Sequence, residues 1–575
     1  MAASAQLVKC APLLLLIGGL AASAQEPTVP PPVAPAALGP EKNLCAGRAE
    51  PVAVGSVQWN GWGRDLSNTR YQPEPAIRAT DVPKLALKWA FGFQSGSDLG
   101  QPTMVDDRLF VTSSSGRIYA LDAKTGCTYW TYDAPAGSRT AVSIGELGQA
   151  KRAAIPRKLK RTLAHLDVIK APSAAFFGDD RGALYALDAQ KGTLLWKTQI
   201  DGHPAARIVG APILYNDRLY VAMGSSEEKS AVSPNYSCCT FRGSISAVDI
   251  ASGRVLWKSY TVLEEAQPTH KNGAGVQEFG PAGAAISSPP TIDPKRGVLY
   301  VGTGRSTTGV EQSLTDAVAA FGLNDGKLRW VKQLNVKGQA ESGGFTSPPI
   351  MRTLASGNEI ILAGQLSGVV YGLDPDHGGE ILWQQRLGGG PVPASAPTTT
   401  AAAATTLAPV TTAGPATPDG TGAAAASVDA GGIAWGASAD HRSLFVAVSG
   451  LLAQPSNASG SLWALDLKTG VPRWHTPAPA TPCSWSEGPC SHAQSQAVTV
   501  MPGGVFSGSM DGHLRAYSTI NGKILWDFNT AKPFQTQNGV RASGGPLEHG
   551  GATIVNGSVY INSGNTLLAF SVDGK

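Results

Sequence analysis

Two adjacent cysteines, Cys238 and Cys239, are the residues whose types and spacing point most sharply to chemistry, and Glu227 and Glu228 lie just upstream of them. Neighbouring cysteines rarely bond to each other, because the eight-membered ring that the bond closes strains the peptide between them. From residue types alone, two separate cysteines are therefore the simpler interpretation, with one of them free or paired elsewhere. A bonded pair stays open as the alternative.

The N-terminus predicts export. Lys9, an apolar run over residues 11–20 and the small residues 22–24 together fit a secretory signal over residues 1–24. The run is too short for a stable bilayer-spanning helix, although an uncleaved anchor stays the alternative. Residues 25–56 begin with a stretch rich in Pro and Ala and are expected to form a flexible leader. We therefore expect a periplasmic or extracellular protein whose mature chain has no membrane span.

Of the seven cysteines, six remain once Cys10 leaves with the signal, and an even number in an exported chain favours disulfides. Cys483 and Cys490 flank a short loop and are expected to pair. Cys45 and Cys127 could pair as well, but the sequence leaves their connectivity open. No Cys-x-x-Cys-His motif occurs, so no built-in haem is expected.

The composition excludes some partners and favours short strands. The formal net charge is only +4, which is too small to argue for a polyanionic partner such as nucleic acid. The chain holds 68 glycines and 41 prolines, so we expect many turns between short strands instead of long helices.

A tryptophan-marked unit recurs along the chain, for example in residues 119–130, 185–196 and 246–257. In each unit an alternating strand ends at an Asp, a tight turn follows around a Gly, and a second strand carries the Trp. Gly suits such a turn because a positive φ costs it little, and the Asp can accept backbone N–H groups. The large flat tryptophan is expected to fill the gap between neighbouring sheets. The marker residues are Trp89, Trp130, Trp196, Trp257, Trp330, Trp383, Trp474 and Trp526.

These eight units predict the fold. A further strand pair precedes each unit, as in residues 108–112, 218–221 and 297–301, and four strands make one propeller blade. We therefore expect an all-β, eight-bladed β-propeller with tryptophan-docking repeats over residues 57–575. The last strand, residues 565–572, is expected to close the ring with the N-terminal segment. An Ala/Thr/Pro tract at residues 388–432 has too few large apolar residues for a core and is expected to be disordered.

Longer segments carry a resemblance to a known family. They are residues 59–71, the stretch 237–244 with the two upstream glutamates, residues 364–374 and residues 508–517. Together they resemble the quinoprotein alcohol dehydrogenases that depend on pyrroloquinoline quinone (PQQ), and most closely the branch similar to polyvinyl alcohol dehydrogenase. The motifs run from about residue 57 to the C-terminus, so the resemblance covers nearly the whole mature chain.

The resemblance implies PQQ and a calcium ion on the propeller axis, where the quinone accepts hydride from an alcohol carbon. It implies a vicinal disulfide between Cys238 and Cys239 that packs on the quinone, and an external electron acceptor such as a cytochrome c. The implied substrates are secondary alcohols, with polymeric ones as a candidate class. The implied cofactor-binding residues are Arg139, Arg242, Cys238 and Cys239, the metal ligands are Glu227, Glu228 and Asp316, and the catalytic base is Asp316.

Five positions depart from the family pattern and support a second hypothesis. Ser287 stands where a tryptophan usually lies under the quinone, Arg305 where an Asn binds calcium, and Leu366 where Lys or Arg contacts the quinone oxygens. Ala434 replaces a polar residue, and Val209 replaces a common Thr. In a propeller these positions converge on one pocket. They therefore favour the alternative of a degenerate, cofactor-free propeller that acts as a binding scaffold. The retained Cys238–Cys239 segment with its two glutamates favours the dehydrogenase, which stays the first hypothesis.

Overall fold

The computed structural model describes residues 38–47, 50–55, 58–96, 100–147, 172–308, 312–334, 344–388, 432–450, 459–479 and 491–575. Strands dominate these residues, and their helices are the 3-10 helix η1 (Ala79–Lys84) and α1 (Glu227–Ser230). Neither helix is long and apolar enough to cross a membrane. The predicted signal segment, the Cys483–Cys490 pair and nearly all of the Ala/Thr/Pro tract lie outside the described residues.

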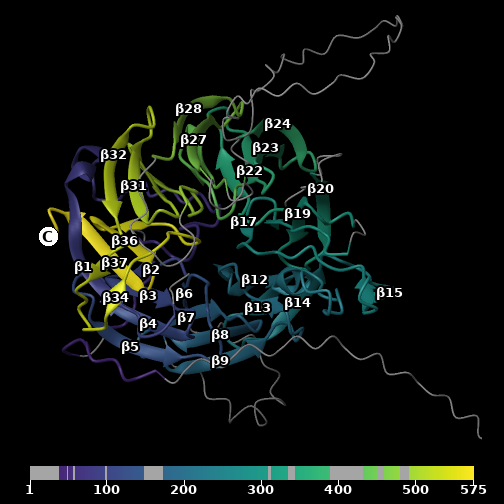
Figure 1. Ribbon diagram of the computed structural model, residues 1–575, viewed down its shortest axis with the longest axis horizontal. Helices are drawn as coiled ribbons and strands as arrows, with labels where there is room; N and C mark the ends of the chain where they lie inside the picture. The colour runs from purple at the N-terminus through teal and green to yellow at the C-terminus, as the bar shows by residue number, and fades with distance from the viewer. Residues whose placement is uncertain are drawn as a thin grey trace, which may run out of the picture.

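Eight blades follow one another around a central axis, each an antiparallel sheet of four strands, with one additional short strand in blade 3 (Figure 1). Blade 1 contains β2 (Thr103–Val105), β3 (Arg108–Thr112), β4 (Arg117–Asp122) and β5 (Thr128–Asp133), and blade 2 contains β6 (Ser143–Glu146), β7 (Ser173–Gly178), β8 (Ala183–Asp188) and β9 (Leu194–Gln199). Blade 3 contains β10 (Ala206–Arg207), β11 (Ile213–Tyr215), β12 (Arg218–Ser225), β13 (Ser244–Asp249) and β14 (Val255–Tyr260). Blade 4 contains β17 (Thr291–Asp293), β18 (Val298–Gly302), β19 (Ala317–Gly322) and β20 (Leu328–Gln333).

Blades 5 to 8 complete the ring. Blade 5 contains β21 (Ile350–Thr353), β22 (Glu359–Gly364), β23 (Val369–Asp374) and β24 (Glu380–Arg386), and blade 6 contains β25 (Ser438–Ala439), β26 (Ser443–Val448), β27 (Ser461–Asp466) and β28 (Pro472–Pro477). Blade 7 contains β29 (Thr499–Met501), β30 (Gly504–Gly508), β31 (His513–Ser518) and β32 (Ile524–Asn529). Blade 8 contains β35 (Thr553–Val555), β36 (Ser558–Ser563), β37 (Thr566–Val572) and β1 (Leu85–Gly92). The predicted eight-bladed all-β propeller is confirmed.

Blade 8 closes the ring with strands from both ends of the propeller. β37 pairs antiparallel with β1, from Leu85 opposite Val572 to Gly92 opposite Thr566. The predicted closure is therefore confirmed, and the outer edge of the last hairpin is paired instead of exposed.

Each marker tryptophan docks its blade onto the next one. In seven blade junctions the indole Nε1 donates to a backbone carbonyl of the following blade at 2.9–3.3 Å, as Trp130 does to Ala189. The turn of the following blade lies against the indole: Gly192 has a φ of +71°, and a Cβ there would come within 2.5 Å of Trp130. In the same turn Asp188 accepts the N–H groups of Gln190 and Lys191 at 2.8 and 3.0 Å. The Asp, Gly and Trp of the repeat are thus parts of one inter-blade contact.

Residues 58–72, called the axial segment below, touch seven blades in their order around the ring. Trp59 pairs with Met104 of blade 1, and Asn60 bonds Ile144 of blade 2. Backbone carbonyls of the segment then accept from blades 4 to 7, and the Gln72 side chain donates to Ile554 of blade 8 at 2.8 Å. The segment therefore ties the inner strands of seven blades together.

Arg70 of the axial segment is a fully buried cation with neutral partners. Its guanidinium donates to the carbonyls of Val498 and Trp62 at 2.7 Å, and to Gln101 and Thr499 side-chain oxygens at 3.0 and 2.9 Å. It also lies 4.9 Å from the ring centroid of Trp62. Burial lowers the pKa of Arg70 to about 9, so the group remains a cation at neutral pH and satisfies acceptors that would otherwise be buried without donors.

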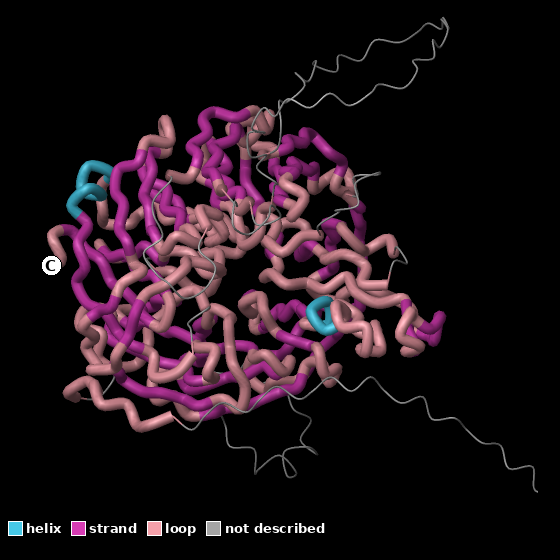
Figure 2. The backbone as a smooth tube through the Cα atoms, viewed as in Figure 1, coloured by secondary structure: helices cyan, strands magenta, loops and turns pink. Residues whose placement is uncertain are grey.

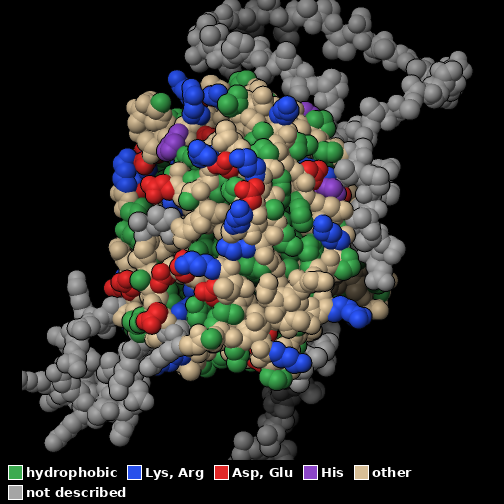
Figure 3. Space-filling view, turned by 90° about the vertical axis from the view of Figure 1, so that its left-hand side faces the viewer, with side chains coloured by type: hydrophobic (Ala, Val, Ile, Leu, Met, Phe, Trp, Pro, Cys, Tyr) green, Lys and Arg blue, Asp and Glu red, His purple; other side chains and the backbone are tan. Residues whose placement is uncertain are grey.

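Outside the ring, two short hairpins and one disulfide extend the blades. The hairpins are β15 (Gln267–Lys271) with β16 (Gln277–Gly280) and β33 (Pro533–Phe534) with β34 (Ala542–Ser543). Cys45 and Cys127 are bonded, which holds the chain before the axial segment against β5. On the face shown in Figure 3, basic and acidic side chains are interspersed, as the small net charge suggests.

Candidate active site

A cavity on the propeller axis is formed by segments that precede the inner strands of six blades. These loops converge at the centre of the ring in Figure 2. The space between its lining residues amounts to about 320 Å³, and part of that space is open to solvent. We call it the axial cavity; it is lined by Trp62, Arg139, Val209, Gly210, Ser287, Ser288, Pro289, Thr346, Trp435 and His549.

Three buried polar atoms of this lining have no hydrogen-bond partner within the described part of the chain. They are Nε1 of Trp62, Oγ of Ser288 and Nδ1 of His549. Buried polar groups in native proteins are nearly always paired, because an unpaired one costs about 1–3 kcal/mol. Three of them around one cavity fit an occupant that offers hydrogen-bonding atoms, either ordered water or a ligand.

Arg139 places a positive charge on the cavity wall. Its Nε and Nη2 donate to the two carboxylate oxygens of Asp180 at 2.9 and 3.0 Å, a bidentate pair that fixes the guanidinium. Nη1 has no hydrogen-bond partner among the described residues. The arginine is thus held in place and retains N–H groups for an acceptor in the cavity.

His549 lies against Trp435, with 4.1 Å between the ring centroids. Its Nδ1 is 3.5 Å from a carboxylate oxygen of Glu548, and its side chain is 15% exposed. Burial, together with the charges of Arg139 and Lys229, lowers the pKa of His549 to about 3. The imidazole is therefore neutral at ordinary pH. Burial raises the pKa of Glu548, and Lys229 opposes that shift.

The depressed pKa of His549 makes the fold sensitive to acid in a defined window. Between about pH 6.5 and 3 the unfolded chain binds a proton at this residue and the native chain does not, so stability falls as the pH falls. The loss approaches about 1.4 kcal/mol per pH unit within that window. Chemical denaturation at pH 6 and pH 4 should show a smaller acid loss for His549→Gln than for the wild type, by roughly 2 kcal/mol. Equal losses in both proteins would contradict the shift.

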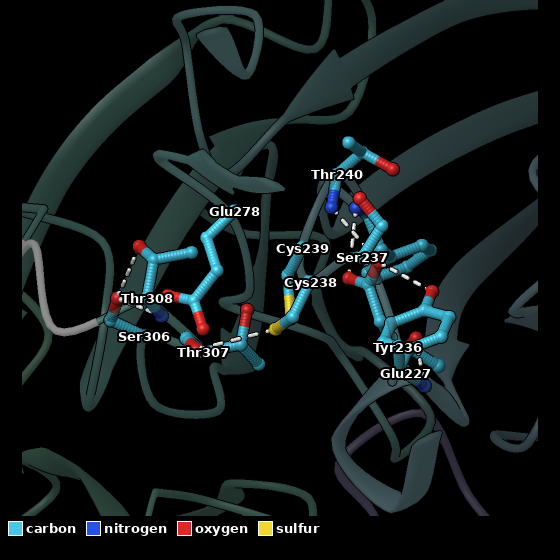
Figure 4. Close-up of a disulfide and its surroundings, with 12 residues drawn as sticks. Glu227, Tyr236, Ser237, Cys238, Cys239, Thr240, Glu278, Ser306, Thr307 and Thr308 are labelled. Atoms are coloured by element: carbon cyan, nitrogen blue, oxygen red, sulfur yellow. Dashed lines mark hydrogen bonds between the residues drawn. A yellow bond between two sulfur atoms is a disulfide. The ribbon is translucent and has the colours of Figure 1, made fainter. Parts of the chain in front are cut away.

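Cys238 and Cys239 are bonded to each other, across a cis peptide bond (Figure 4). The interpretation from residue types alone, two separate cysteines, is therefore wrong, and the pairing implied by the resemblance is confirmed. Phe279 of β16 brackets the pair, since its carbonyl accepts from Cys239 N at 3.2 Å and its N–H donates to the Cys238 carbonyl at 2.6 Å. Cys239 is fully buried, and Cys238 is half-buried with Sγ 4.0 Å from the Thr307 carbonyl.

Glu227 holds the loop that carries this disulfide. One carboxylate oxygen accepts from the Tyr236 hydroxyl at 3.1 Å and from Thr240 N at 2.9 Å, and the other accepts from Phe241 N at 2.9 Å. The side chain is almost completely buried, so its charge is stabilised by these donors. Figure 4 shows Glu227 and Tyr236 on one side of the cysteines and Glu278 with Thr307 on the other.

Glu228 does not share the partners of Glu227 and instead lies near the guanidinium of Arg305. Its Oε1 lies 3.9 Å from Nε of Arg305, and both side chains are about half exposed. Within the described residues, no three His, Cys, Asp or Glu side chains gather in a way that could hold a metal ion. Glu227 and Glu228 are thus sequence neighbours with separate partners.

The family follows from comparison with known proteins. Residues 59–428 match the model of the PQQ family, described as the β-propeller domain of glucose, ethanol and alcohol dehydrogenases. The chain belongs to the quinoprotein alcohol dehydrogenase family. Residues 366–575 also match a family model described as the outer membrane protein assembly factor BamB.

Among curated relatives of this quinoprotein, two polyvinylalcohol dehydrogenases are similar over most of their length. The one from Pseudomonas sp is 40% identical, with 92% of this chain and 80% of the relative covered. The one from Sphingopyxis sp. (strain 113P3) is 37% identical, with 92% and 79% covered. Among solved structures, quinohemoprotein alcohol dehydrogenase from Comamonas testosteroni has the same fold, with a TM-score of 0.59, 18% identity, and 90% of this chain and 81% of that chain covered.

The axial cavity of the quinoprotein contains only part of the predicted site. Arg139 lines the cavity, whereas Cys238, Cys239, Glu227, Glu228, Arg242 and Asp316 are not among its lining residues. Arg242 stacks on Tyr260 at 4.0 Å and lies 3.6 Å from Glu265. Asp316 is buried at the start of β19, has a φ of +49°, and bonds Gly304 through its backbone N–H at 3.0 Å. The cofactor, metal and base roles of these residues stay predictions.

The five departures from the family pattern fall into two groups. Val209 and Ser287 line the axial cavity, and the carbonyl of Ala434 accepts from the cavity residue Thr346 at 2.5 Å. Arg305 and Leu366 are not lining residues. The predicted convergence on one pocket therefore holds for Val209 and Ser287, while Ala434 contacts a residue of the cavity wall.

Sequence reasoning missed three aromatic residues of the cavity. Trp62 lies in residues 59–71, which carry part of the resemblance, and Trp435 follows Ala434, one of the five departures; neither tryptophan belongs to the repeat. His549 precedes the pair Gly550–Gly551 just before an inner strand. Two features of the sequence could have indicated these residues. Trp62 and Trp435 are tryptophans that do not fit the spacing of the repeat, and His549 is a polar residue that directly precedes two glycines.

Proposed function

We propose that the chain binds PQQ in the axial cavity and oxidises secondary alcohols there, polymeric alcohols included. The observation that carries the proposal is the set of three unpaired polar atoms beside Arg139 in a cavity with aromatic walls. The proposal also rests on the family to which the chain belongs and on the two similar polyvinylalcohol dehydrogenases.

The residues of the cavity fit this cofactor. PQQ is a planar quinone whose carbonyl and carboxylate oxygens are all hydrogen-bond acceptors. The cavity offers donors for them: the indole N–H of Trp62, the hydroxyl of Ser288, the guanidinium of Arg139 and the ring N–H of His549. Trp62 and Trp435 add flat apolar surface for a planar ring system.

These residues can hold and shield the cofactor. When bound, the quinone supplies the acceptor for the hydride that leaves the alcohol carbon. Arg139, fixed by Asp180, pairs with a carboxylate group. Trp62 of the axial segment forms part of the cavity wall and would cover part of a bound cofactor. The proposal assigns the role of base to Asp316 and places the Cys238–Cys239 pair against the quinone.

Calcium fits the described residues less well. Glu228 lies near Arg305, Glu227 has both carboxylate oxygens in hydrogen bonds, and no third carboxylate joins them. We therefore assign calcium no part in the reaction. The activity screen below is run both with and without calcium.

The cellular setting follows from the sequence and belongs to the same proposal. Export to the periplasm or beyond is proposed from residues 1–24. Each alcohol oxidised releases two electrons, so an external acceptor such as a cytochrome c is proposed, since no haem-attachment motif occurs.

An activity screen tests the function. Purified mature protein is loaded with PQQ, with and without calcium, and assayed with an artificial electron acceptor on polyvinyl alcohol, small secondary alcohols and primary alcohols. Turnover that requires PQQ and prefers the secondary alcohols supports the proposal. PQQ-dependent turnover of primary alcohols alone would contradict the substrate class, and no turnover on any alcohol would favour the cofactor-free scaffold.

A further inference from the structure

We propose that His549 is a cofactor-contacting residue of the axial cavity, which donates a hydrogen bond from its neutral ring to an oxygen of the bound quinone. This inference rests on the proposed function, because it requires PQQ in the axial cavity. It assigns a role to a residue that neither the repeat nor the resemblance singled out.

The first observation is the position of the ring. His549 lines the cavity, and its Nδ1 is buried without a hydrogen-bond partner among the described residues. The nearest carboxylate oxygen, of Glu548, is 3.5 Å from Nδ1, beyond the length of a good hydrogen bond. A neutral imidazole has one donor and one acceptor, so the ring has hydrogen-bonding capacity to offer an occupant.

The second observation is how firmly the ring is placed. The His549 carbonyl accepts from Ala497 N at 3.1 Å, and the ring packs against Trp435. The residue has a φ of +63°, which side chains rarely adopt. Residues that are pre-positioned in this way are typical of ligand sites.

The turn beneath His549 is fixed by the buried arginine of the axial segment. Gln101 Oε1 accepts from both Arg70, at 3.0 Å, and the backbone N–H of Gly551, at 2.7 Å. A Cβ at Gly551 would collide with the Ala497 carbonyl and with the Arg70 guanidinium. The hydrogen bonds among Arg70, Gln101 and Gly551 therefore fix the position of the backbone that carries His549.

The third observation is charge, which decides between a donor and a base. Arg139 and Lys229 act on the ring from two other blades, and Glu548 adjoins it on its own chain. A ring kept neutral by burial and two cations is a weak base but a competent hydrogen-bond donor. The acceptor-rich, anionic quinone is the complementary partner for such a donor.

The test measures PQQ affinity of the purified mature protein by tryptophan fluorescence, for the wild type, His549→Phe and His549→Gln. Phenylalanine retains the stacking on Trp435 but cannot donate, and glutamine can donate. We expect about tenfold or greater weakening for His549→Phe and affinity within about threefold of the wild type for His549→Gln. His377→Phe is the matched control, because His377 is an exposed residue of the β23–β24 turn paired with Asp374.

Wild-type affinity in His549→Phe would overturn the inference and leave the proposed function standing. Absence of PQQ binding by the wild type would instead overturn the proposed function, and this inference with it. If His549→Phe does not fold, the ring nitrogens of ¹⁵N-histidine-labelled wild type are followed during PQQ titration, with His549→Gln used to assign the signal. A changed His549 signal supports the contact, and an unchanged one excludes it.

Discussion

Replacing Arg70 by alanine is expected to lower the free energy of unfolding by about 4 kcal/mol. The guanidinium donates four hydrogen bonds to neutral acceptors, two of them backbone carbonyls, in a place with no access to water. Alanine leaves these acceptors buried without donors and opens a cavity beneath Trp62. Equilibrium denaturation of the wild type and the variant measures the difference.

The matched control is Arg329→Ala, because Arg329 pairs with Asp325 on the surface and both side chains are about 40% exposed. Exposed ion pairs contribute about 0.2–1 kcal/mol, so this change should have little effect. If Arg70→Ala were as mild as Arg329→Ala, the axial segment would not hold the ring together as described.

Replacing Arg139 by alanine is expected to weaken PQQ binding by about 30-fold or more. The change removes the cation from the cavity wall and leaves the Asp180 carboxylate without its bidentate partner, so the site becomes repulsive to an anionic cofactor. The pKa of His549 should also rise, because Arg139 is one of the two cations that lower it. PQQ titration and a pH titration of the His549 ring measure the two effects.

Asp180→Asn is the counterpart of that change. It keeps the arginine and removes the negative charge, so PQQ affinity should stay the same or increase. Weakening of the same size in both variants would mean that the Arg139–Asp180 pair acts only by shaping the loop, and would contradict a direct charge interaction with the cofactor.

The fold could be predicted from the sequence because each blade is local. In seven of the eight blades the strands follow one another in the chain. The contact between blades is made by an Asp, a Gly and a Trp that recur with a period, such as Asp188, Gly192 and Trp130. The closure by residues 565–572 is not local, but it was predictable because an open ring would leave an unpaired strand edge.

The site was predicted only in part, because its residues come from segments far apart in the sequence. His549, Trp435 and Trp62 have no common spacing, and only the ring brings them together. Arg70 was not recognised as a core residue, since charged residues are rarely buried without an opposite charge. The Cys238–Cys239 bond was indicated by the resemblance, whereas the residue types alone favoured separate cysteines.

The measurement that tests the account most directly is a titration of the purified mature protein with PQQ, with and without calcium, followed by quinone absorbance and tryptophan fluorescence. We expect saturable binding of one PQQ per chain, with a fluorescence change because Trp62 and Trp435 line the cavity. Absence of saturable binding, both with and without calcium, would contradict the axial cavity as a PQQ site. The propeller would then have to be treated as a scaffold.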